Sequence, residues 1–443
     1  MTNPAEFNLR QIAVPAFAPS MLYGIADGAV LPVVALSALE LGTTPAVAGF
    51  IAALAGIGAL VSNVPAAAMT ARIGERRAML AAAAIAMIGY LLCALSTRVG
   101  LMAVGVWLFG MASAVFSLAR QTWLINTVPF TMRARALSTL AGSMRIGVFI
   151  GPFAGAALIH RFGLHGAYGA AMLALLVLIV IVWRLPELPD VPEQPAAQAG
   201  GSAGGPVTGS AGGSATGSVG GSVSGSVSGS AAGTPAAGST ASLVPSPSSF
   251  RAVLRSHAHV YRTLGIGVVM VAAMRASRQV VVPLWSDALG LSAASASLIY
   301  GLAAMVDMTV FYPAGKVMDR FGRVWIALPC TLLMGCAFLL TPLTTGFTSF
   351  LLVAMLLGLA NGIGSGIVMT MGADAAPRDN RTRFLGIWRM MADTGSSLGP
   401  LLLSSITALA SLGAGIAAIG GLGFAAAAVF WRHLPHGRGK AGH

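Results

Sequence analysis

The sequence has few charged residues. They make up 9% of 443 residues, against roughly a quarter in soluble proteins, while 56% are hydrophobic and mean hydropathy is +0.82. This composition excludes a soluble globular domain. It indicates a membrane protein, in which runs of about 20 apolar residues cross the hydrocarbon layer as helices.

Cysteine is also scarce. Cys93, Cys330 and Cys336 all lie in apolar runs without Cys-x-x-Cys spacing, which excludes a disulfide framework. The histidines lie in loops or at the ends of runs, and no pair suits a metal inside the membrane. No glycine loop is followed by the Lys and Ser or Thr that bind phosphates, and no catalytic triad is evident. We therefore expect no metal, no cofactor and no enzymatic activity.

Acidic residues are outnumbered by basic ones, 13 to 26, which gives a net charge of +13. The basic residues follow the loops on one side of a membrane rather than forming a nucleic-acid patch. If both termini share one side, only Arg98 and Arg161 lie on the other. Because basic loops stay in the cytoplasm, we expect a multi-pass protein of the cytoplasmic (inner) membrane with both termini inside. Its partners are then the lipid bilayer and a small-molecule substrate.

Twelve apolar runs predict an all-α membrane protein with twelve transmembrane helices. The first six are 14–38, 45–70, 78–97, 101–125, 136–159 and 166–184. The second six are 262–286, 292–315, 324–343, 348–373, 384–408 and 412–431.

The two sets of runs are copies of one unit, because a shift of 248 positions aligns them without a gap. Examples are Pro65 with Pro313, Gly110 with Gly358 and Trp183 with Trp431. Duplicated halves are typical of secondary transporters, in which two domains rock around a central site. We therefore predict two pseudo-symmetric six-helix domains, 1–186 and 258–443. Residues 187–257, rich in Gly and Ser, are predicted to be a disordered cytoplasmic linker.

A repeated loop motif follows the second run of each half. In the second half it reads G-x-x-x-D-R-x-G-R, with Gly315, Asp319, Arg320, Gly322 and Arg323. In the first half Arg72, Gly74 and Arg76 match, but Ala71 replaces the acid. This motif resembles the hallmark loop of the major facilitator superfamily. A glycine turn of this kind aims charges at neighbouring helix ends, where they form a conformational latch.

The fifth run of each half carries glycines and a proline. They are Gly147, Gly151, Pro152 and Gly155, and in the second half Gly395, Gly399 and Pro400. This pattern resembles the fifth-helix signature of the superfamily's twelve-helix drug:proton antiporters. The glycines allow a close helix contact and the proline bends the helix, which predicts a tight, bendable contact between the halves. Generic packing of small residues is the alternative.

Apart from Arg184 and Arg262 at the ends of their runs, eight charged residues lie inside the runs, where charge is costly and marks an ion or substrate path. They are Asp27, Arg120, Arg145, Arg275, Arg278, Asp307, Arg389 and Asp393. The offset maps Asp27 onto Arg275 and Arg145 onto Asp393. If spans 1 and 5 are adjacent, as in the proteins this one resembles, we expect the pairs Asp27–Arg145, Arg275–Asp393 and Arg278–Asp307.

Three interpretations of these charges remain open. Asp27 or Asp307 carries a coupling proton, the acids are permanently paired as scaffold, or the arginines hold an anionic substrate. The resemblance implies proton-coupled export of small amphiphilic or drug-like molecules by a monomer. The alternatives are proton-coupled uptake or exchange of a small organic anion, and a membrane sensor that does not transport.

Overall fold

The computed structural model describes residues 13–128, 133–184, 250–377 and 380–434, and every described element is helical. The first half contains α1 (Ala13–Glu40), α2 (Pro45–Ile73), α3 (Glu75–Ala94), α4 (Val99–Thr127), α5 (Arg133–Phe162) and α6 (His165–Trp183). Short turns join the helices where the connections are described, residues 129–132 between α4 and α5 lie outside the described part, and each helix is long enough to cross a bilayer.

The second half repeats this order with additional short elements, and its fourth span is divided into two helices. It begins with the short helices α7 (Phe250–Ser256) and α8 (Ala258–Val260) and one π-helical turn, η2 (Tyr261–Gly265). Then follow α9 (Ile266–Ala288), α10 (Ala293–Phe321), α11 (Val324–Leu340), the 3-10 turn η3 (Thr341–Leu343), α12 (Phe347–Ile363), α13 (Ile367–Ala375), α14 (Arg381–Leu409) and α15 (Leu412–His433).

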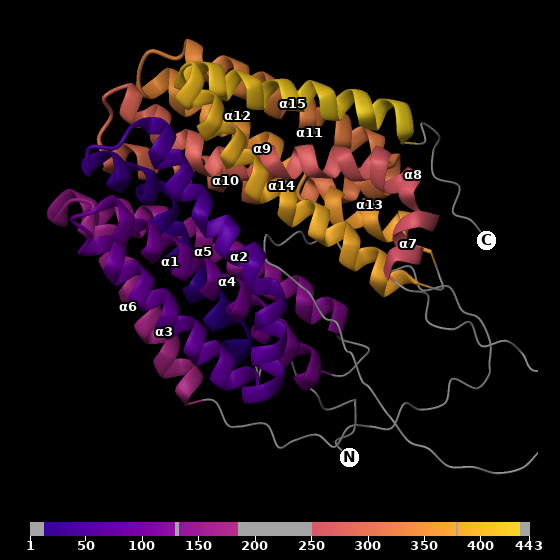
Figure 1. Cartoon of the computed structure of the whole chain (residues 1–443), viewed down its shortest axis with the longest axis horizontal. Helices are drawn as coiled ribbons and strands as arrows, with labels where there is room; N and C mark the ends of the chain where they lie inside the picture. Colours follow the sequence, from indigo (N-terminus) through magenta and orange to yellow (C-terminus); the bar gives the residue numbers. More distant parts are fainter. Residues whose placement is uncertain (1–12, 129–132, 185–249, 378–379, 435–443) are drawn as a thin grey trace, which may run out of the picture.

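Equivalent helices pack in the same way within each half. The contacts of α1 with α5 and α6 recur as those of α9 with α14 and α15, and those of α4 with α2 and α3 recur as those of α12 with α10 and α11. Between the halves, α2 packs on α14 and α5 packs on α10. Figure 1 shows the two bundles side by side, meeting at one end and diverging toward the end where α6 and α15 finish.

Eleven helical segments of the described chain are long and apolar enough to cross a membrane. The twelfth predicted span is α14, which is 29 residues long but carries four charged residues and several Ser and Gly residues. It packs against α2, α9 and α15, so protein surrounds much of its polar sequence. The prediction of an all-α fold in two six-helix halves is confirmed.

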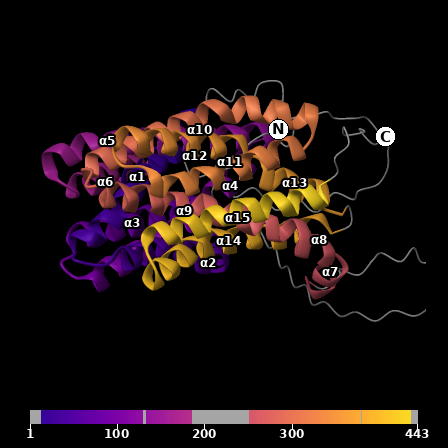
Figure 2. The same ribbon diagram turned by 90° about the horizontal axis from the view of Figure 1, so that it is seen from above.

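One domain boundary differs from the prediction. Helix α7 covers Phe250–Ser256, inside the range 187–257 predicted as linker, and packs against α14. Figure 2 shows α7 and α8 at the end of the second half, near the last turn of α15. The boundary was missed because a seven-residue helix has too few residues for a periodic pattern. Residues 187–249 lie outside the described part of the chain.

Candidate functional site

Two glycine turns form the loops that carry the repeated motif. Gly74 and Gly322 have φ angles of 81° and 100°, in the left-handed region that favours glycine. Their N–H groups donate to Thr70 O at 3.0 Å and Met318 O at 3.1 Å, which closes the last turns of α2 and α10. The predicted tight turns are confirmed.

Side-chain contacts join each loop to the fourth span of its own half. Arg323 Nε donates to Asp374 Oδ2 at 2.8 Å in the second half, and Asn126 Nδ2 donates to Glu75 Oε1 at 2.8 Å in the first. The offset of 248 relates the two contacts. The acid therefore stands on the loop in one half and on the fourth span in the other.

The other motif residues make local contacts. Arg76 donates to the carbonyl oxygens of Val182, at 3.2 Å, and Trp183 at the end of α6. The Arg320 guanidinium lies 5.4 Å from the centroid of the Phe321 ring. Arg72 is exposed, and a Cβ at Gly315 would meet open space. The side chain of Asp319 lies outside the described part, so its role in a latch stays a prediction.

The Arg323–Asp374 contact gives a first test of the latch. Both side chains are partly exposed, at 28% and 51%, and such pairs contribute less than about 1 kcal/mol. We expect Asp374→Asn to leave the thermal unfolding midpoint of the purified protein nearly unchanged while altering its transport rate. An unchanged rate contradicts a latch role for this pair.

The glycines of α5 and α14 let a neighbouring helix approach very closely. A Cβ at Gly147 or Gly151 would overlap the backbone oxygen of Met21 or Ile25 in α1. The equivalent Gly395 and Gly399 face the backbone oxygens of Val269 and Ala273 in α9. Gly155 is looser, since its Cβ would lie 3.3 Å from Ala29 O. Both contacts lie within a half, so the prediction that this stripe seals one half against the other is wrong.

The prolines of the same motif lie inside unbroken helices. Pro152 is an internal residue of α5, and Pro400 is an internal residue of α14. A proline at such a position removes one helical hydrogen bond. Both helices nevertheless continue beyond it for more than two turns.

Asp27 lies inside the first half. Its Oδ1 accepts a hydrogen bond from Tyr90 Oη at 3.0 Å, so the contact joins α1 to α3. Tyr23, one turn before Asp27, stacks on Phe116 of α4 with ring centroids 4.2 Å apart. Tyr90 therefore links this carboxylate to α3, and the nearby aromatic stack links α1 to α4.

Arg120 is buried in the same half, with 1% of its surface exposed. Its Nε donates to Ser20 Oγ at 3.2 Å, and its guanidinium carbon lies 4.9 Å from the centroid of the Trp123 ring. Arg120 thus ties α4 to α1.

Asp307 on α10 joins α9 to α12. Its Oδ2 lies 3.7 Å from a guanidinium nitrogen of Arg278 and accepts a hydrogen bond from Asn361 Nδ2 at 2.6 Å. The Arg278 guanidinium carbon is also 5.8 Å from the ring centroid of Tyr300. The predicted ion pair Arg278–Asp307 is confirmed.

A break in the fourth span of the second half lies next to this pair. Helix α12 ends at Ile363 and α13 begins at Ile367. Arg275 of α9 donates to the carbonyl oxygen of Gly364 inside the break. Arg145, from α5 of the first half, donates to Ser365 Oγ, and its guanidinium carbon lies 4.4 Å from the ring centroid of Phe311. Two arginines from different halves therefore meet at one turn.

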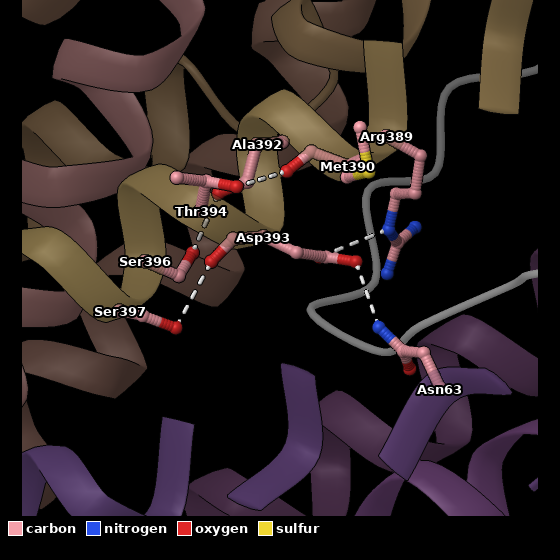
Figure 3. Close-up of polar contacts among 8 residues, drawn as sticks. All are labelled: Asn63, Arg389, Met390, Ala392, Asp393, Thr394, Ser396 and Ser397. Carbon is pink, nitrogen blue, oxygen red and sulfur yellow. Dashed lines mark hydrogen bonds and ion pairs between the residues drawn. The ribbon is translucent and has the colours of Figure 1, made fainter. Parts of the chain in front are cut away.

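A second cluster crosses the interface between α14 and α2. Asp393 pairs with Arg389, one turn earlier, at 3.1 Å, and accepts a hydrogen bond from Asn63 Nδ2 at 3.3 Å. Figure 3 shows Arg389 and Asp393 on α14 facing Asn63 on α2. The offset of 248 maps Asp393 onto Arg145 and Asn63 onto Phe311. The two interfaces therefore have contacts at equivalent positions, a hydrogen bond at one and an arginine–aromatic contact at the other.

These halves, loops and interfaces match a known family along nearly the whole chain. The family model described as Major Facilitator Superfamily matches residues 17–274 and 264–442. The chain belongs to the major facilitator superfamily. It is therefore a multi-pass membrane transporter of small molecules and not an enzyme.

Solved structures of other major facilitator transporters share this fold. A POT family transporter in complex with a thioalcohol-conjugated peptide is 13% identical, with TM-score 0.67 and coverage of 96% of each chain. The nucleoside transporter NupG is 14% identical, with TM-score 0.64 and coverage of 94% of this chain and 98% of that one. The xylose transporter XylE from E. coli, partially occluded and inward open, is 14% identical, with TM-score 0.65 and coverage of 98% and 99%. No curated protein matches the chain significantly.

Two of the ion pairs predicted for this transporter are wrong. Asp27 and Arg145 do not pair, because Arg145 contacts the second half instead. Helices α1 and α5 are adjacent as expected, but their contact face is the glycine stripe. At 100° per residue, Arg145 lies about 200° around α5 from Gly147 and points toward α10.

The same geometry separates Arg275 from Asp393. Arg275 binds the carbonyl oxygen of Gly364, whereas Asp393 binds Arg389 and Asn63. Asp393 precedes the stripe residue Gly395 by two positions, as Arg145 precedes Gly147. It therefore faces the first half rather than α9.

Several polar partners were missed from the sequence. Tyr90, Asn361, Ser365 and Asn63 each bind one of the charged residues. All four are polar residues inside apolar runs, and this was the available signal. The three glycines of Asn361-Gly-Ile-Gly-Ser-Gly366 also indicate the helix break.

Proposed function

We propose that this major facilitator protein is a proton-coupled secondary transporter of the cytoplasmic membrane. It exports small amphiphilic or drug-like molecules by alternating access, as drug:proton antiporters do, and acts as a monomer with both termini in the cytoplasm. The observation that carries the proposal is the setting of Asp27, whose hydrogen-bond partner is the neutral phenol of Tyr90.

Asp27 suits a coupling proton better than Asp307 does. Protonation of Asp307 would weaken its ion pair with Arg278 and its hydrogen bond from Asn361. Asp27 has no cationic partner within ion-pair distance in the described part of the chain, so protonation breaks no ion pair. A carboxylate in this setting exchanges a proton when the motion of the halves changes its access to water.

A second candidate function is proton-coupled uptake or exchange of a small organic anion. The arginines at the break of α12 and α13 favour it, because guanidinium groups bind carboxylates and phosphates directly. The direction of transport distinguishes the two candidates.

The test is accumulation of fluorescent cationic dyes and labelled small carboxylates in efflux-deficient bacteria, with and without a protonophore. Wild type, Asp27→Asn and Asp287→Asn are compared, and Asp287 is an exposed control acid at the end of α9. Export predicts low dye levels that rise to those of empty cells with protonophore or with Asp27→Asn, but not with Asp287→Asn.

The other outcomes are equally informative. Unchanged dye levels with protonophore-sensitive accumulation of a carboxylate support uptake of an anion. Well-expressed protein that changes neither dye nor carboxylate levels contradicts both candidates.

A further inference from the structure

Three arginines gather around the break between α12 and α13. Arg275 and Arg145 bind the two consecutive residues Gly364 and Ser365. Arg278 lies one turn after Arg275 on α9 and pairs with Asp307 at 3.7 Å. The group therefore joins the first half, through α5, to three helices of the second half.

The charges of this group do not balance. Among the described residues, the carboxylate that forms an ion pair with this group is Asp307, which lies 3.7 Å from Arg278. Excess positive charge away from bulk water is costly unless other groups compensate it. Arg278 is 8% exposed, and its Nε, Arg275 Nε and Asp307 Oδ1 have no hydrogen-bond partner among the described residues. Buried donors without partners indicate a site that is completed by a ligand or by water.

The break itself belongs to the second half alone. Gly362, Gly364 and Gly366 stand where the first half has Ala114, Phe116 and Leu118, and α4 runs through that region without interruption. A Cβ at Gly364 would overlap Cys330 Sγ and meet the Arg275 guanidinium at 2.8 Å, so the glycine makes room for both side chains. Interrupted helices of this kind bind substrates in other transporter folds.

We propose that Arg145, Arg275 and Arg278 bind an anionic group of the transported compound, a carboxylate or a phosphate. Planar guanidinium groups match the oxygens of both groups with paired hydrogen bonds. Because Arg145 comes from one half and the other two arginines come from the other, a bound anion contacts both halves. The inference rests on the second candidate function, uptake or exchange of a small organic anion, and names the three side chains that bind the anion.

The test is the thermal unfolding midpoint of the purified, detergent-solubilised protein with four probes of one shape. Benzoate and phenyl phosphate are anionic, benzamide is neutral and benzylammonium is cationic. We expect a concentration-dependent rise with one or both anions and none with benzamide or benzylammonium. The anion that raises the midpoint more at equal concentration shows whether the site prefers a carboxylate or a phosphate.

Variants locate the site. Arg275→Gln and Arg145→Gln should each weaken anion binding by about tenfold or more, since each removes a charge-assisted hydrogen bond. Arg161→Gln, an exposed arginine at the end of α5, is the matched control and should bind as wild type does. Equal shifts with benzamide or benzylammonium, or no anion-dependent shift in the wild type, overturn the site whatever the variants do.

Binding and transport can fail separately. Proton-driven transport of dyes without anion binding overturns the anion site and leaves the proposed function standing. Arginine-dependent anion binding without any proton-dependent flux supports the site and contradicts the proposed coupling.

Discussion

Gly151→Leu should prevent recovery of folded protein. A side chain at this position meets the backbone of α1, with a Cβ 2.6 Å from Ala29 N and 2.7 Å from Gly28 C. Backbone atoms cannot rotate away as a side chain does, so α1 and α5 must separate along their whole contact. Overpacking of a well-packed core typically costs about 1–3 kcal/mol, and we expect a larger loss here because backbone atoms block the side chain.

A graded series makes this prediction precise. Gly151→Ala should lower the thermal unfolding midpoint strongly, and Gly399→Ala should do the same in the second half. Gly142 lies on the same helix as Gly151 with open space around its Cα, so Gly142→Ala is the matched control. It should be neutral or slightly stabilising, because alanine favours a helix over glycine by about 1 kcal/mol. The close contact is contradicted if the Gly151→Leu protein is recovered and elutes from a size-exclusion column at the wild-type position.

Asp307→Ala should destabilise the second half by about 3–5 kcal/mol. Removing one member of a buried ion pair leaves the other charge without its partner, and here Arg278 would face two further arginines. The thermal unfolding midpoint in detergent measures this loss. Asp287→Ala, at an exposed acid, is the control.

The double variant Arg278→Gln/Asp307→Asn separates charge from packing. It removes both charges and keeps most of the volume, so it should recover part of the stability that Asp307→Ala loses. A midpoint of Asp307→Ala equal to that of Asp287→Ala contradicts a structural role for the pair.

The architecture was predictable because it depends on patterns that repeat along the chain. The offset of 248 relates whole helices, loops and the contacts Arg323–Asp374 and Asn126–Glu75. In any membrane protein, apolar runs predict transmembrane helices and glycines between them predict tight turns. The two halves and their twelve spans therefore follow from the sequence.

The pairing of charges was less predictable. A two-residue shift around a helix turns a side chain by about 200°, and this places Arg145 against α10 rather than α1. Arginine is also long enough to reach the next domain, as the contact with Ser365 shows. Only Arg278 and Asp307, on consecutive antiparallel helices, formed the expected pair.

The glycine stripe shows a different limit of the sequence. Its residues indicate a close contact but not its partner. Gly147 and Gly151 face α1 of their own half, whereas the interface between halves uses other glycines. Gly56, for example, lies near Ser397, and a Cβ at Gly301 would meet the ring of Phe153.

Transport in proteoliposomes of purified protein tests the central claim, that Asp27 couples substrate movement to protons. A pH gradient of known size is imposed, and accumulation of the best substrate from the cell assay is followed for wild type and Asp27→Asn. We predict that wild type concentrates substrate only while the gradient lasts, and that Asp27→Asn equilibrates substrate without concentrating it. Gradient-driven accumulation by Asp27→Asn at the wild-type level would contradict the account.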